Sequence, residues 1–163
     1  MPPLTWAAAL ALALTAWAWA PPARACLGLG CACSVSATPV AFGVYDPFAA
    51  APRETAGDVA VTCSALVAVN FSYEIKLSPG GGGAFAARRM ASGANTLSYQ
   101  LYTEGYVAVW GDGGAGTVTQ SNSYLLTVLS GRTDHFSVAA RAPAGQNVKP
   151  GAYSDTITVT IVF

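Results

Sequence analysis

The sequence of 163 residues has the length of one domain, and its eight basic and eight acidic residues leave a formal net charge of zero. Only 10% of the residues are charged, and they form no basic patch, which argues against a nucleic-acid-binding protein. Solubility must then rest on Ser, Thr, Asn and backbone groups, and such a composition favours a protein that enters an assembly over one that diffuses freely.

The N-terminal region is typical of an export signal. Residues 4–20 are uncharged and almost purely Ala, Leu, Trp and Thr, and the run is short for a membrane span, which needs about 20 apolar residues. Ala23 and Ala25 then form an A-x-A cleavage pattern before Cys26, although residues 1–5 carry no Lys or Arg. We expect a cleaved signal peptide at 1–25 and one exported domain at 26–163. The alternatives are an uncleaved membrane anchor and a lipoprotein attached through Cys26.

Beyond residue 26 the pattern predicts strands and turns, because no apolar period of 3.6 residues persists for three turns. Apolar residues alternate with polar ones most clearly over 67–77, which predicts a half-buried antiparallel strand. Further strands are expected over 59–63, 97–101, 107–109, 124–129 and 136–140. Gly, Pro and Asp-Gly turns separate these runs, and this spacing predicts an all-β sandwich or barrel.

The chain ends in another alternating run. The run carries no charge, and three threonines alternate with its apolar residues, which are Ile157, Val159, Ile161 and Phe163. A strand edge of this kind invites pairing with another chain, and monomers normally avoid it. We therefore predict that this strand docks a partner.

Four cysteines follow the predicted signal peptide, and an even count in an exported chain predicts disulfides. Cys33 and Cys63 both share the parity of apolar neighbours, so we prefer a Cys33–Cys63 bridge, which leaves Cys26 for Cys31; the other two pairings stay open. The Cys31-x-Cys33 spacing is too tight for a usual structural zinc site, and His135 is the only histidine. No metal or other cofactor is predicted.

Other candidate residues have ordinary structural interpretations. His135 with its neighbours Asp134 and Ser137 lacks the arrangement of a hydrolase triad, so no enzyme and no catalytic residue are predicted. Arg88 and Arg89 are expected to be a solvated pair after a glycine-rich loop. Trp110 is expected to pack in the core or on a sheet, with a ligand-binding face shared with Tyr106 as the alternative.

Several segments in order give the sequence a recognisable pattern. They are CSVSATP at 33–39, FGVYDP at 42–47, GDVAVTC at 57–63, RRM at 88–90, LSYQLY at 97–102, VWGDG at 109–113, PAGQN at 143–147 and GAYSDT at 151–156. No single motif is specific, but together they resemble the spore coat protein U domain family, which is shared with subunits of archaic chaperone–usher pili.

This resemblance implies an incomplete immunoglobulin-like, pilin-type β-sandwich that lacks its last strand. It also implies partners: a periplasmic chaperone that lends a strand, an outer-membrane usher, and neighbouring pilus or coat subunits that later replace the lent strand. The expected function is a structural subunit of a surface fibre or coat that supports adhesion or biofilm. The N-terminal stretch 26–32 is short and Gly-rich, so the chain is better equipped to accept a strand than to donate one. The alternative is a self-sufficient secreted module that binds glycans or surfaces.

Overall fold

The computed structural model describes residues 30–67, 69–127 and 129–163, and the predicted signal peptide and Cys26 lie outside these ranges. The described chain is built from strands and short 3₁₀ turns, which confirms the all-β prediction. In chain order the elements are β1 Ala32–Thr38, β2 Arg53–Ala65, β3 Val69–Leu77, η1 Gly80–Gly82, η2 Phe85–Ala87, β4 Arg89–Ser92, β5 Asn95–Ser98, β6 Gln100–Tyr102, η3 Glu104–Tyr106, β7 Gln120–Leu126, β8 Ser130–Ala142 and β9 Val159–Val162.

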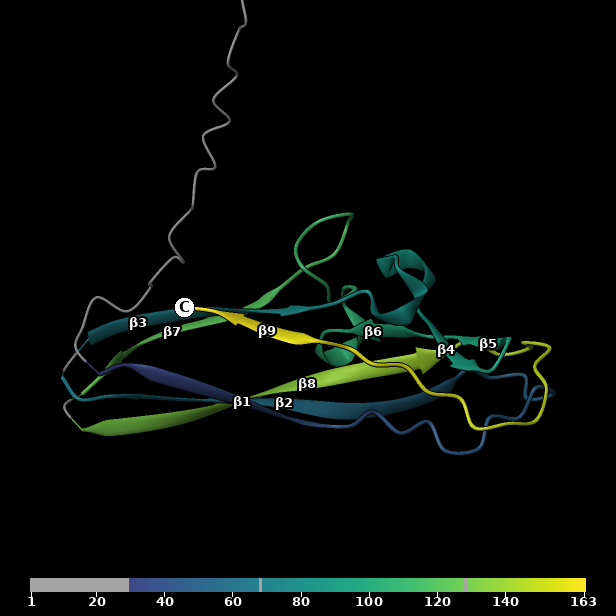
Figure 1. Cartoon of the computed structure of the whole chain (residues 1–163), viewed down its shortest axis with the longest axis horizontal. Coiled ribbons are helices and arrows are strands. Elements are labelled where there is room, and N and C mark those ends of the chain that lie inside the picture. Colours follow the sequence, from purple (N-terminus) through teal and green to yellow (C-terminus); the bar gives the residue numbers. More distant parts are fainter. Residues whose placement is uncertain (1–29, 68, 128) are drawn as a thin grey trace, which may run out of the picture.

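Two sheets form the sandwich. One has the strand order β1-β2-β8-β6 and the other has the order β7-β3-β9, while β4 and β5 form a separate hairpin. All strand pairs are antiparallel. Figure 1 shows the two layers, with β3, β7 and β9 above β1, β2 and β8, and with the C-terminus at the end of β9.

The core lies between the two layers and follows the predicted alternation. In β3 one face is buried, with Phe71, Tyr73, Ile75 and Leu77 each 3% exposed or less. In β2 the buried face consists of Val59, Val61, Cys63 and Ala65, and β8 adds Val138, Ala140 and Ala142. Because side chains alternate across a strand, β2 and β3 give their apolar sets to the core. The core-facing side of β8 also carries one buried carboxylate, Asp134, which accepts a hydrogen bond from the Tyr73 hydroxyl at 2.6 Å.

Three predicted strands differ in the structure. The strand expected over 124–129 is β7, which begins earlier, at Gln120, and ends at Leu126. The run over 97–101 is split at Tyr99, because β5 pairs with β4 in the hairpin whereas β6 pairs with β8 in the first sheet. No strand forms over 107–109: Val107 has helical backbone angles after η3, and Val109 makes only an isolated bridge with Tyr102. The partners that decide how the segments 97–101 and 107–109 pair are β4, β8 and Tyr102, and all of them lie outside these two segments.

Candidate functional site: an open groove beside the C-terminal strand

Strand β9 is at the edge of its sheet and pairs on one side only, with β3. Just before it, Thr158 uses both backbone groups toward β3: its N–H donates to the Ser78 hydroxyl at 2.9 Å, and its carbonyl accepts from the Ser78 N–H at 2.9 Å. Backbone groups alternate in direction along a strand, so those of Val159 and Ile161 point away from β3. The Leu77 N–H agrees with this register, because it donates to Gly111 and not to its facing residue Val159.

The same residues turn their side chains inward. The predicted docking set, Ile157, Val159, Ile161 and Phe163, is half-buried and packs against the core. The Phe163 ring lies 5.9 Å from the Phe71 ring, centroid to centroid. Thr158, Thr160 and Val162 face outward and are exposed. The apolar side chains and the unpaired backbone groups of this edge therefore belong to the same residues. The paired strand itself is shorter than the predicted 157–163 and covers only Val159–Val162.

Across the gap from β9 lies β1, the edge strand of the other sheet. Val35, on the apolar face of β1, is 42% exposed although its facing residue Val61 is fully buried. The Cys33–Cys63 disulfide, which confirms the predicted pairing, joins two facing residues and fixes β1 to β2. Cys31 is also disulfide-bonded, whereas Cys26 lies outside the described residues. The position of β1 at the groove is thus fixed by a covalent link and by pairing on one side.

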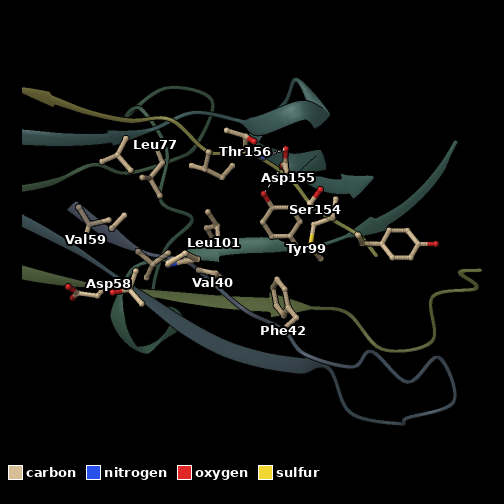
Figure 2. Close-up of a pocket in the computed structure, with 18 residues that line it drawn as sticks. Val40, Phe42, Asp58, Val59, Leu77, Tyr99, Leu101, Ser154, Asp155 and Thr156 are labelled. Atoms are coloured by element: carbon tan, nitrogen blue, oxygen red, sulfur yellow. Dashed lines mark hydrogen bonds between the residues drawn. The ribbon is translucent and has the colours of Figure 1, made fainter. Parts of the chain in front are cut away.

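A cavity of about 430 Å³ opens between β1 and the C-terminal segment. Figure 2 shows residues that line it, contributed by both sheets and by the stretches that follow β1 and precede β9. The apolar part of this lining includes Val40, Phe42, Val59, Leu77, Leu101, Val138, Ile157 and Val159. A cavity of this size between two edge strands is space that a further apolar side chain can fill.

The C-terminal segment is fixed to the sandwich just before β9 by residues that also line this cavity. Asp155 accepts hydrogen bonds from the Gly81 N–H at 2.8 Å and from the Tyr99 hydroxyl at 2.7 Å. Burial, and then the bond to Asp155, raise the pKa of Tyr99 well above its usual value, so its hydroxyl stays a donor. Ser154 exchanges two backbone hydrogen bonds with Ala91 of β4. The segment therefore has a fixed position before it enters β9.

Arg88 supports the loops behind this anchor, and its predicted solvation is wrong. The side chain is 1% exposed, and its guanidinium donates to Gln100 Oε1 at 2.8 Å and to the carbonyls of Ser78 and Trp110, each at 2.9 Å. Burial lowers the pKa of Arg88 from its ordinary value. Arg89 is exposed, as expected. No local sequence pattern indicates this burial, because the carbonyls that bind Arg88 belong to other segments of the chain.

The alternative prediction, a ligand-binding face formed by Trp110 and Tyr106, is wrong for Trp110. Trp110 is fully buried and its indole N–H donates to the Ile75 carbonyl at 3.2 Å, so it cannot contact a ligand in this structure. Tyr106 is partly exposed. His135 binds Asp58, with Nδ1 2.8 Å from Oδ2, on the outer face of the first sheet. In the described ranges no three His, Cys, Asp or Glu side chains are placed to hold a metal ion, and no helix is long and apolar enough to cross a membrane.

The two sheets and the unpaired edge at β9 define an immunoglobulin-like sandwich of the incomplete, pilin type. Comparison with known proteins agrees and identifies the family: the Spore Coat Protein U domain model matches residues 25–160, and the chain belongs to this family. Protein U of Myxococcus xanthus is 31% identical over 132 residues, which are 75% of this chain and 70% of that protein.

Solved structures share the fold, and one of them comes from a pilus assembly complex. It is a chain from the crystal structure of the CsuC–CsuE chaperone–tip adhesion subunit pre-assembly complex of the archaic chaperone–usher Csu pili of Acinetobacter baumannii. The TM-score is 0.55 at 22% identity, and the match covers 82% of this chain. This chain spans only 40% of the length of that solved chain.

Proposed function

We propose that this protein is a structural subunit of an exported surface fibre or coat, completed at the β9 edge by a β-strand from another chain. The observation that carries the proposal is the open edge itself, where unpaired backbone groups, inward apolar side chains and a cavity occur together. Membership of the Spore Coat Protein U domain family and the fold shared with a chain of a chaperone–usher pilus complex support it.

The physical reason for a partner is the exposed edge. An unprotected edge strand with alternating apolar side chains pairs with other chains and aggregates. A periplasmic chaperone would cover the edge during export, an outer-membrane usher would receive the complex, and a neighbouring subunit would then supply the permanent strand. Adhesion or biofilm formation would be the consequence of the assembled fibre or coat at the cell surface.

In strand addition, the backbone and the side chains of the docking residues have different roles. Backbone hydrogen bonds to Val159 and Ile161 supply affinity, and pockets for alternate side chains supply specificity. The cavity beside Ile157 would accept one large apolar side chain of the incoming strand. Phe163 would close the other end of the groove against Phe71.

The test is co-purification of the full chain from the periplasm, with and without a co-expressed chaperone. We expect a one-to-one complex with the chaperone and little soluble chain without it. Ile161→Asp places a charge in the groove and should abolish the complex, whereas Val162→Asp places the same charge on the outer face and should retain it. Recovery of a stable soluble monomer without any partner contradicts the proposal.

A second variant separates a loss of docking from a loss of folding. A strand of alternating apolar residues is appended after Phe163 through an Asn-Gly turn, so that it can fold back on β9 as a hairpin. We expect this self-complemented chain to be soluble and monomeric without a chaperone and to bind the chaperone no longer. If the appended strand changes neither property, the β9 edge is not the docking site.

A further inference from the structure

Two tyrosines lie together on the outer face of the first sheet, away from the core. Tyr102 belongs to β6 and Tyr106 ends η3, and their ring centroids are 5.6 Å apart at an interplanar angle of 63°. Both residues remain partly exposed. An aromatic ring at such a position offers an apolar face and a polar hydroxyl to the same ligand.

A charged pair lies against these rings. The guanidinium carbon of Arg141 is 4.4 Å from the centroid of the Tyr106 ring and 5.9 Å from that of Tyr102. The Arg141 Nε donates to Glu54 Oε1 at 2.7 Å, and Nη2 of the same residue lies 2.6 Å from that oxygen. Their side chains are 38% and 43% exposed, so each retains surface for further hydrogen bonds. The two opposite charges leave this part of the surface neutral.

Small residues extend the surface along the sheet. In the row next to Glu54 and Arg141, exposed Ala56 faces Ala139, which in turn faces Tyr102 of β6. Two residues further along β2, Asp58 holds His135. Since a strand rises about 3.4 Å per residue, Glu54 and Asp58 are about 14 Å apart along β2. This span, with polar groups at both ends and a low apolar floor between them, fits two linked sugar rings.

The backbone of Tyr106 gives an independent reason to look for a ligand here. Its φ is +59°, a left-handed conformation that a large side chain seldom adopts, and its N–H donates to the Thr103 carbonyl at 3.1 Å. Such strain persists where the surrounding structure enforces it, and it is concentrated at ligand-binding positions. The conformation places the Tyr106 ring against Arg141.

We propose that this surface, formed by Tyr102, Tyr106, Arg141, Glu54 and Ala56, binds a neutral saccharide of about disaccharide length. The C–H face of a pyranose ring packs on a tyrosine, and its hydroxyl groups bond to the paired charges, which offer donors on Arg141 and acceptors on Glu54. The Arg141–Glu54 pair is balanced, and Asp58 at the far end of the span adds a carboxylate, so the surface does not favour an acidic sugar. The site does not depend on the proposed strand-accepting function, because it lies on the outer face of the other sheet.

The experiment measures saturation transfer by NMR from the full chain, with any co-purifying partner bound and the partner alone as a control. The probes are maltose, cellobiose and lactose, with digalacturonate as the charged comparison. At least one neutral disaccharide should bind saturably. Tyr106→Gly, which suits the left-handed backbone, and Tyr102→Ala should each weaken binding about tenfold, the scale of one lost aromatic contact.

Phe48→Ser is the matched control, since Phe48 is 94% exposed on the β1–β2 loop and should not affect binding. Thermal unfolding of each variant verifies that it is folded. Three results would overturn the proposal: no saturable binding of any neutral disaccharide, binding that both tyrosine variants leave unchanged, or binding confined to digalacturonate.

Discussion

Replacement of Arg88 by methionine tests how the loops behind the groove are held. Methionine keeps an unbranched apolar stem of similar reach and removes the guanidinium, which donates to Gln100, Ser78 and Trp110. Gln100 Oε1 also accepts from the Leu101 N–H at 3.0 Å and stays satisfied. The Trp110 carbonyl, which is buried, and the Ser78 carbonyl, which is partly buried, both lose the Arg88 donor.

The expected loss in the free energy of unfolding follows from these two carbonyls. Each buried acceptor left without a donor costs about 1–3 kcal/mol, which gives roughly 2–6 kcal/mol for the pair. Removal of a buried cation that no carboxylate contacts directly recovers part of this, because desolvation of the charge is unfavourable. We therefore expect Arg88→Met to lower the free energy of unfolding by about 3 kcal/mol, a large share of the 5–15 kcal/mol of a typical domain.

The assay is denaturant unfolding of the disulfide-bonded chain, followed by tyrosine fluorescence and circular dichroism. Arg89→Met is the matched control, because Arg89 is exposed and reaches only Gly82 O at 3.5 Å; it should change stability by less than about 0.5 kcal/mol. A loss below about 1 kcal/mol for Arg88→Met, or equal losses for the two variants, would refute the assigned role of the buried guanidinium.

Three further outcomes are expected. Replacing both Cys33 and Cys63 by alanine should lower the free energy of unfolding by about 3.6 kcal/mol, the loop-closure value for a separation of 30 residues. A reductant should then have less effect on unfolding than it has on the unmodified chain. Burial alone would raise the pKa of Asp134, but hydrogen bonds from Tyr73 and a neighbouring arginine outweigh it and hold that pKa below its usual value. The stability that this carboxylate contributes is therefore complete above about pH 4 and is lost as the pH falls through the lowered pKa. Asp134→Asn should make the free energy of unfolding fall less steeply at acid pH. An unchanged acid dependence would contradict this. Ala115→Gly, at a φ of +51°, should raise the melting temperature, whereas Ala94→Gly, at a residue without positive φ, should lower it.

Much of the sandwich could be predicted because its strands alternate regularly. The apolar parity of 67–77 and 59–63 identified the buried faces of β3 and β2, including Cys63, and with them the disulfide. This works because burial of one sheet face imposes a period of two on the sequence. The apolar set at the C-terminus followed the same rule, and its residues lie half-buried at the edge of the second sheet.

What could not be predicted depends on partners far away in the sequence. Arg88 is buried because the carbonyls of Ser78 and Trp110 happen to converge on it, and no local pattern records that convergence. Tyr99 interrupts a regular apolar run because β5 and β6 join different sheets. Tyr106 was expected on a possible ligand face with Trp110, but its pairing with Tyr102 was missed, since one ring belongs to a strand and the other to a turn with a left-handed residue.

The most direct test of the open edge is amide hydrogen exchange along β9, resolved by residue with NMR. In the chain alone, the N–H groups of Val159 and Ile161 point away from β3 and should exchange fast, while those of Thr160 and Val162 should be protected by pairing with β3. When a chaperone or a complementing strand binds, Val159 and Ile161 should become protected as well. Equal protection of all four amides in the chain alone, or no change at Val159 and Ile161 on binding, would contradict the claim that this edge receives a strand.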